Sequence, residues 1–188
     1  MKNFLLVAAG LDMTPVRQEL MLHPELWGAE KFREEYANSP HVDATDIVLR
    51  YSPPEALDRA NTALAQNSNT SVWYPASRIL QTWKPLVRAL ATKVEAYSLE
   101  RAMFVSLPPG GRILPHADVQ GSYVNMGDIV RYHLVVQALP GVIFRGDDEI
   151  VQMQTGEVWL FNAHCQHEIM NNSADDRIHL IVDFRVWG

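Results

Sequence analysis

Three residues in the second half of the chain have the types and spacing of metal ligands. His116 and Asp118 are separated by one residue, and His167 follows farther along the chain. Side chains two positions apart on a strand project to the same face, so His116 and Asp118 can share one ion. Two imidazoles and one carboxylate on one side of Fe(II) leave the opposite positions open for an organic co-substrate and O₂. The pattern therefore indicates a non-haem iron centre that His167 completes from another part of the fold.

A candidate carboxylate anchor follows the second histidine. Arg177 comes directly after the turn-forming residues 171–176, which predict a hairpin loop between two apolar strands that lie side by side. The metal ligand His167 would lie near one strand and the guanidinium on its partner. A planar guanidinium holds a carboxylate by two parallel hydrogen bonds, as an anchor for the distal carboxylate of 2-oxoglutarate requires.

Several short motifs between residues 100 and 186 occur in a specific order and spacing. They are His116-Ala117-Asp118, Arg131-Tyr132-His133-Leu134, Gly156-Glu157-Val158-Trp159, His167-Glu168-Ile169 with Asn171 or Asn172, and Arg177 leading into Leu180-Ile181-Val182-Asp183. In this arrangement the chain resembles the aspartyl/asparaginyl β-hydroxylase-like branch of the Fe(II)- and 2-oxoglutarate-dependent dioxygenases.

The resemblance implies a role for each candidate site residue. The implied iron ligands are His116, Asp118 and His167, the implied 2-oxoglutarate anchor is Arg177, and the implied secondary contacts to the co-substrate are Arg131 and His133. Fe(II), O₂ and 2-oxoglutarate as co-substrate are implied with them. His164 competes with His167 as the distal ligand. We favour His167 because its distance to Arg177 and the Glu-Ile pair that follows it match the resemblance.

Strand alternation places further residues around this site. Arg131 and His133 share one face of a strand, either toward the interior or as an exposed pair on a solvated face. His179 shares a face with the anchor arginine, as a residue that lines the site or as a buried histidine with satisfied hydrogen bonds. We expect Asp183, on the same strand, to be a structural partner. The polar segment 119–129 has the composition of a lid over the substrate or of a surface loop.

Composition and charge narrow the classes of function. The chain has 188 residues, of which 47% are hydrophobic and 20% charged, as expected of one globular domain. A net charge of −6 argues against a nucleic-acid partner. Cys165 is the one cysteine, so no intramolecular disulfide can form and a cytoplasmic location is expected. No apolar stretch approaches the length that spans a membrane.

The order of the predicted elements indicates the fold. A helix-rich part over about 1–100 precedes a β-barrel core over about 101–188. The first part is expected to hold an N-terminal strand from Phe4, helices over 14–22, about 54–66 and 76–97, and a strand over 46–51, with Pro85 as a kink or a true helix start. The second part should hold strands over 102–107, 130–137, 142–144, 150–154, 158–161 and 177–186. This order favours a mainly β fold, a jelly-roll or cupin-like double-stranded β-helix braced by the N-terminal helices.

The expected activity is hydroxylation of a C–H bond, with decarboxylation of 2-oxoglutarate to succinate. A small molecule, a free amino acid and a peptide residue are all compatible as substrates. One alternative is a cupin-like metalloenzyme that does not use 2-oxoglutarate, for which Arg177 would have no purpose. The other is a non-catalytic β-barrel binding module, because a fold does not by itself determine a function.

Overall fold

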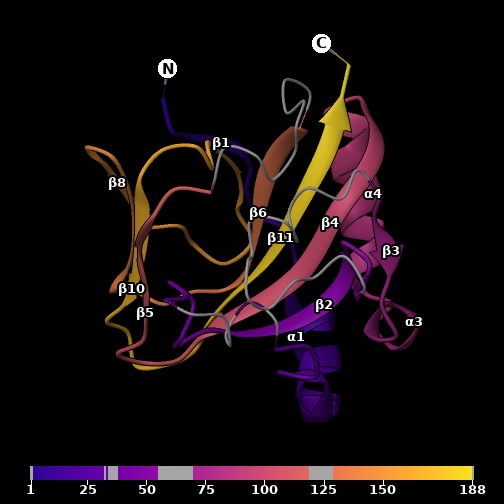
Figure 1. Ribbon diagram of the computed structural model, residues 1–188, viewed down its shortest axis with the longest axis horizontal. Coiled ribbons are helices and arrows are strands. Elements are labelled where there is room, and N and C mark those ends of the chain that lie inside the picture. The colour runs from indigo at the N-terminus through magenta and orange to yellow at the C-terminus, as the bar shows by residue number, and fades with distance from the viewer. Residues whose placement is uncertain (1, 32, 34–37, 55–69, 119–128, 188) are drawn as a thin grey trace.

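Two β-sheets form the body of the protein. The computed structural model describes residues 2–31, 33, 38–54, 70–118 and 129–187 (Figure 1). In order across the larger sheet, the strands are β1 (Phe4–Ala8), β9 (Val158–Phe161), β6 (Ile129–Gln137), β11 (Arg177–Val186), β4 (Ala96–Leu107), β2 (Thr45–Tyr51) and β3 (Val72–Trp73). The smaller sheet has the order β5 (Arg112–His116), β10 (His167–Asn171), β7 (Val142–Gly146) and β8 (Glu149–Val151). The mainly β architecture agrees with the prediction from the sequence.

One face of the larger sheet is covered by helices, and the other is directed toward the smaller sheet. Successive side chains of β11 point alternately to these two faces. Leu180 and Val182 belong to a core cluster that includes Trp83 from a helix. Ile181, between them in the chain, belongs to a second cluster that includes Phe144 from the smaller sheet. Because successive side chains point to opposite faces, Arg177, His179 and Asp183 share the inner face with Ile181.

The helices cover the outer face of the larger sheet (Figure 1). They are α1 (Thr14–Leu22), a short 3-10 helix (Pro24–Leu26), α3 (Ala76–Ile79) and α4 (Trp83–Lys93). Buried side chains of α1 and α4 pack into the same core cluster as Leu180, which explains how the helices brace the sheet. Within the described ranges, no helix combines the length and apolar character needed to cross a membrane.

The single helix predicted over 76–97 is wrong. The structure has α3 and α4 instead, and Leu80 between them has extended backbone angles, φ −78° and ψ 126°. The carboxylate of Glu19 accepts hydrogen bonds from the backbone N–H groups of Gln81 (2.8 Å) and Thr82 (3.0 Å), so α1 stabilises this break. Pro85 lies in the first turn of α4, where a proline is tolerated, and thus marks the true helix start. The helix expected over 54–66 lies almost entirely outside the described residues.

The predicted hairpin between His167 and Arg177 is also wrong, because β10 and β11 belong to different sheets. β10 is hydrogen-bonded on its two sides to β5 and β7, and β11 to β4 and β6. Neither strand has an edge left for the other. The connection after β10 therefore crosses between the sheets, and buried Asn171 stabilises it by donating from Nδ2 to the carbonyl oxygens of Leu107 (2.8 Å) and Asp175 (2.9 Å).

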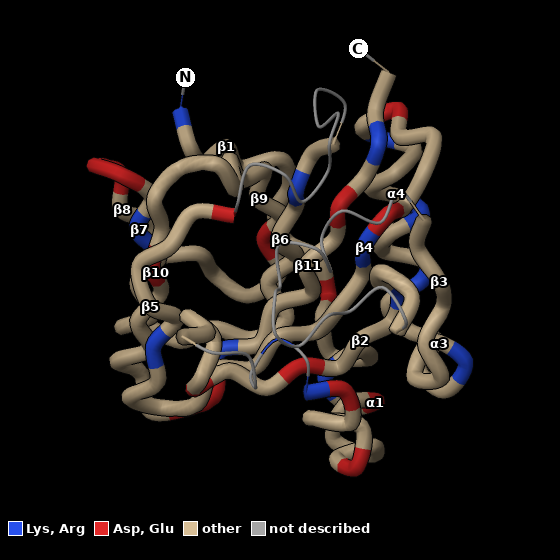
Figure 2. Tube along the Cα trace, viewed as in Figure 1, with Lys and Arg blue, Asp and Glu red and all other residues tan. Residues whose placement is uncertain are grey.

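The strands from the first hundred residues join the same sheet as those of the second part. β2 pairs with β4, and β1 pairs with β9, so both extend the larger sheet. In the charge distribution of Figure 2, acidic and basic residues also occur on strands in the middle of the sheet.

Candidate metal centre

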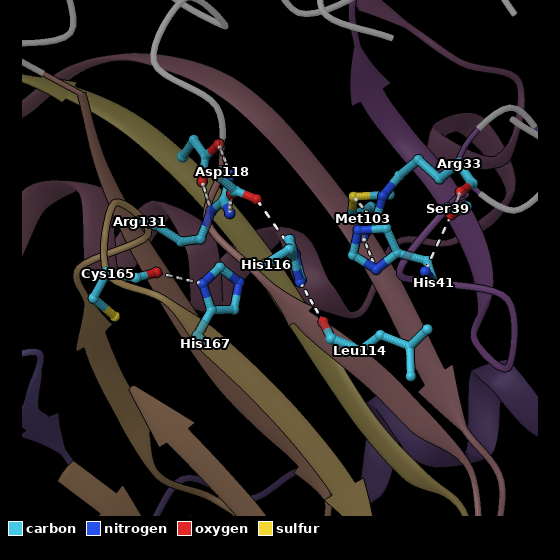
Figure 3. Close-up of polar contacts among 11 residues, drawn as sticks. Arg33, Ser39, His41, Met103, Leu114, His116, Asp118, Arg131, Cys165 and His167 are labelled. Carbon is cyan, nitrogen blue, oxygen red and sulfur yellow. Dashed lines mark hydrogen bonds and ion pairs between the residues drawn. The ribbon is translucent and has the colours of Figure 1, made fainter. Parts of the chain in front are cut away.

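The three predicted ligands come together at one end of the smaller sheet. His116 on β5 is directly opposite His167 on β10, and the centroids of their rings are 4.2 Å apart. Asp118 follows the end of β5, where its backbone N–H donates to the carbonyl oxygen of Ala163 (3.0 Å). One potential ligand atom from each of the three residues lies within 4.8 Å of the other two (Figure 3). The cross-strand pair is what brings His167 to the two earlier residues.

The two imidazoles are oriented by backbone carbonyl groups. The Nδ1 atom of His116 lies 2.7 Å from the carbonyl oxygen of Leu114, and that of His167 lies 2.9 Å from the carbonyl oxygen of Cys165. A carbonyl oxygen only accepts, so both Nδ1 atoms carry the proton and both Nε2 atoms keep a free lone pair. Burial lowers the pKa of His167 to about 4, so the ring is neutral at pH 7. Neutral imidazoles with free Nε2 atoms are ready to bind a metal.

The carboxylate of Asp118 is held by Arg131. Arg131 Nη1 donates to Asp118 Oδ2, while the other oxygen, Oδ1, lies 3.6 Å from His116 Nε2. Burial alone would favour the neutral acid, but Arg131 and His167 outweigh it and hold the pKa of the Asp118 carboxyl well below its usual range. Arg131 also donates to Asp183 from Nε (2.7 Å) and Nη2 (2.8 Å). The structure therefore places Arg131 beside the candidate metal centre and shows Asp183 as a structural partner of this arginine.

A fully buried arginine lies deeper on the inner face. Arg177 has 0% exposure, and its Nη2 donates to Nδ1 of His179 at 2.8 Å. Its Nε and Nη1 atoms are buried without a hydrogen-bond partner. Burial lowers the pKa of Arg177 to about 9, so it stays charged at pH 7. Unpaired donors on a buried cation are costly, and a ligand carboxylate would satisfy them.

Phe144 connects the arginine to the metal centre. Its ring centroid lies 5.9 Å from the guanidinium carbon of Arg177 and 6.1 Å from the ring centroid of His167. His133 packs against the same ring at 5.4 Å and is only 2% exposed, so its alternative placement on a solvated face is wrong. The candidate metal ligands and the two unpaired donor atoms of Arg177 therefore face one interior, as a chelating ligand with a distal carboxylate would require.

A cavity of about 450 Å³ lies next to this centre. Arg131, Phe161, His164 and Asp183 are among the residues that line it. His164 is exposed and is not one of the three clustered ligands. The segment 119–129, considered above as a lid, lies outside the described residues apart from its last member.

Sequence reasoning missed a polar cluster on the other side of His116. The ring of His41 meets the ring of His116 edge-on, with centroids 4.9 Å apart. Arg33 reaches both His41 (3.1 Å) and Asp46 (2.8 Å), as Figure 3 shows in part. Asp46 on β2 is buried, with 1% exposure. The sequence signal was its place in an apolar strand, directly before the three buried residues Ile47, Val48 and Leu49.

Comparisons with known proteins decide the family. Residues 62–186 match the family described as aspartyl/asparaginyl β-hydroxylase. The chain belongs to this family. The resemblance inferred from the motifs is thereby confirmed.

Two curated relatives of this chain are named as proline hydroxylases. The L-proline cis-4-hydroxylase of Rhizobium meliloti (strain 1021) is 28% identical over 111 residues, which cover 58% of this chain and 37% of the relative. The L-proline cis-3-hydroxylase 1 of Streptomyces sp is 28% identical over 76 residues, which cover 40% of this chain and 26% of the relative. The matched part thus spans well under half of either relative.

Solved structures share the fold at low sequence identity. A prolyl hydroxylase from Trichoplax adhaerens, in complex with a hypoxia inducible factor peptide fragment, has a TM-score of 0.60 and 12% identity. The match covers 97% of this chain and 83% of that one. An oxidoreductase of the 2OG-Fe(II) oxygenase family from Burkholderia pseudomallei has a TM-score of 0.57 and 12% identity, with 97% and 84% covered. These likenesses confirm the predicted double-stranded β-helix.

Proposed function

We propose that this protein is an Fe(II)- and 2-oxoglutarate-dependent dioxygenase that hydroxylates a free amino acid or an amino-acid residue of a peptide. One observation carries the proposal. Two neutral imidazoles and an ionised carboxylate converge on one point, and a buried cation with unpaired donors lies near the same Phe144 ring as His167. A ligand that chelates a metal at one end and carries a carboxylate at the other fits both.

The donor set suits ferrous iron, and the residues divide the work of binding. His116, Asp118 and His167 would hold Fe(II), and Arg177 would bind the distal carboxylate of 2-oxoglutarate. When bound, iron and co-substrate supply the oxidation of a C–H bond by O₂, coupled to decarboxylation of 2-oxoglutarate to succinate. The chain itself supplies orientation, charge and the exclusion of water.

The secondary contacts differ in what they can contribute. Arg131 holds Asp118 Oδ2, which leaves Oδ1 directed to the side of His116. Arg131 would thus orient Asp118 as a metal ligand. Any contact of Arg131 with the co-substrate would be additional to its hydrogen bond with Asp118. His133 is buried between Phe144 and Phe161, at centroid distances of 5.4 and 5.5 Å, and its Nε2 atom has no partner. It would line the co-substrate site.

Relatives and cavity together suggest the substrate class. The curated relatives are named for hydroxylation of L-proline, and one structural neighbour holds a peptide. The cavity of about 450 Å³ beside Arg131 and Phe161 has room for an amino acid or a peptide side chain. A cytoplasmic location is part of the proposal, because iron is more easily kept ferrous in a reducing compartment.

Two alternatives make different demands on these residues. A cupin-like metalloenzyme that does not use 2-oxoglutarate would keep the three ligands but would leave the buried cation Arg177 without a purpose. A non-catalytic binding module would need neither. Neither alternative accounts for both features at once.

The experiment is a turnover assay with purified protein. Succinate is measured after incubation with Fe(II), 2-oxoglutarate and O₂, with and without L-proline or proline-containing peptides, and mass spectrometry follows the gain of one oxygen atom. We expect iron-dependent succinate formation that a chelator abolishes. Stoichiometric iron binding with no consumption of 2-oxoglutarate would instead favour the cupin-like alternative.

A further inference from the structure

Arg177 and His179 form a buried pair that the proposed activity does not by itself require. Both side chains lie on the inner face of β11, with 0% and 1% exposure. The 2.8 Å contact runs from Arg177 Nη2 to His179 Nδ1. A guanidinium has donors and no acceptor, so the imidazole must accept at Nδ1. His179 is therefore protonated at Nε2, and its ring is neutral.

His133 continues the same chain of hydrogen bonds. Its Nδ1 atom lies 3.3 Å from His179 Nδ1. Two lone pairs at this distance would repel each other, so the proton in this contact is on His133 Nδ1, which shares the single lone pair of His179 Nδ1 with the closer donor of Arg177. The two buried histidines are thus opposite tautomers, with the proton on Nδ1 in His133 and on Nε2 in His179.

The walls around His179 restrict its ring. On the neighbouring strands it is paired with Val105 of β4 and Val135 of β6, and both valines have 0% exposure. A ring packed between two β-branched side chains has little room to turn. The acceptor at Nδ1 therefore has a fixed position relative to the guanidinium.

We propose that His179 is the positioning residue for Arg177: its Nδ1 atom holds the guanidinium so that the remaining donors face the distal carboxylate of the co-substrate. The inference rests on the proposed function, in which Arg177 binds 2-oxoglutarate. Without His179, the buried guanidinium would lose the hydrogen bond from Nη2 and could turn away from the ligand.

Two substitutions separate positioning from simple packing. In His179→Asn, the amide oxygen lies about where Nδ1 was and can accept from Arg177. In His179→Leu, a side chain of similar bulk fills the space without an acceptor. His23→Leu, at a partly exposed position after α1 that belongs neither to the ligand cluster nor to the cavity, is the matched control.

Calorimetry on the Mn(II)-loaded protein without O₂ measures binding of two 2-oxo acids. 2-Oxoglutarate has the distal carboxylate, and 2-oxobutyrate lacks it. We expect His179→Leu to weaken 2-oxoglutarate binding about tenfold or more, the loss typical of one hydrogen bond to a charged group. Binding of 2-oxobutyrate should stay unchanged, and His179→Asn should restore 2-oxoglutarate binding to within about threefold of wild type.

Three outcomes would overturn the proposal. One is equal 2-oxoglutarate binding by wild type and His179→Leu, and another is equal weakening of both acids, which would mean a structural role. The third is the opposite tautomer pair, read from long-range ¹H–¹⁵N correlations of the imidazole rings. If the wild type binds no 2-oxoglutarate, both the proposed function and the proposed role of His179 fail. If the wild type binds 2-oxoglutarate and His179→Leu binds it equally well, only the proposed role of His179 fails.

Discussion

Arg131 donates a hydrogen bond from Nη1 to Oδ2 of Asp118 and so determines which carboxylate oxygen lies toward His116. The same guanidinium is anchored by two hydrogen bonds to Asp183, which has 1% exposure. A candidate metal ligand at the end of β5 is in this way attached to the inner face of the larger sheet. Partners of this kind commonly tune the metal affinity of the ligand they hold.

Replacing Arg131 with Met should therefore impair both metal binding and stability. We expect Mn(II) affinity to fall about 10–100-fold, because Asp118 loses its orienting partner. The free energy of unfolding should fall by about 1–3 kcal/mol, because buried Asp183 would lose two hydrogen bonds and keep only its ion pair with Arg101 (3.4 Å). Calorimetric titration and denaturant unfolding measure the two effects.

The control for this variant is Arg145→Met. Arg145 contacts Glu168 at 3.4 Å with its side chain 51% exposed, so its loss should cost at most about 1 kcal/mol. Equal effects of the two substitutions would show that the Arg131 contacts contribute no more than a surface ion pair.

The two histidines of the segment before β10 should differ in metal binding. His167→Ala should abolish stoichiometric binding of Fe(II) or Mn(II), because its Nε2 atom faces the other two ligands. His164→Ala should retain most of it, because His164 is exposed and outside the cluster. Metal content after dialysis tests this, and the reverse pattern would make His164 the distal ligand.

Arg177→Ala should weaken 2-oxoglutarate binding by about 2–5 kcal/mol, most of it from leaving the ligand carboxylate unpaired in a buried site. Arg177→Lys should also bind poorly, because an ammonium cannot reproduce the planar pair of donors. The concentration dependence of succinate formation at saturating iron gives the apparent affinity of each variant. An unchanged value in Arg177→Ala would make Arg131 or His133 the leading anchor candidate.

Stability should depend on pH through the buried histidines. Burial, and after it the charge of Arg177, holds the pKa of His133 and of His179 well below the usual value. In the unfolded chain both titrate near pH 6.5, so below that pH the unfolded state binds protons that the folded state does not. The free energy of unfolding is therefore highest above about pH 6.5 and should fall by about 1.4 kcal/mol per pH unit and histidine as the pH drops further.

Denaturant unfolding at several pH values between about 5 and 8 measures this dependence. His179→Asn removes one titrating group, so below about pH 6.5 its curve should be shallower than that of wild type by about 1.4 kcal/mol per pH unit. Parallel curves would mean that His179 takes up a proton in the folded protein, contrary to the neutral ring inferred from Arg177.

Only the tertiary structure decided how the strands meet. Alternation gives the face of a side chain but not the strand that pairs beside it, so the predicted partnership of the His167 and Arg177 strands was wrong. The contact between Arg131 and Asp118, and the burial of His41 against His116, also depend on segments that are distant in sequence. Which strands pair depends on how the two sheets pack around one core. This packing involves residues that are distant in sequence, so the local pattern of side chains does not determine it.

The sequence by itself determined the parts of this protein that depend on local pattern. The spacing of His116 and Asp118 and the period of the strand from Arg177 to Asp183 were enough to predict a shared ligand face and an inward arginine, because side-chain direction along a strand has a fixed period. The motif order also identified the family. The interior that joins these residues came from packing, since the Phe144 ring on β7 lies 6.1 Å from the His167 ring and 5.9 Å from the guanidinium carbon of Arg177, which is on the other sheet.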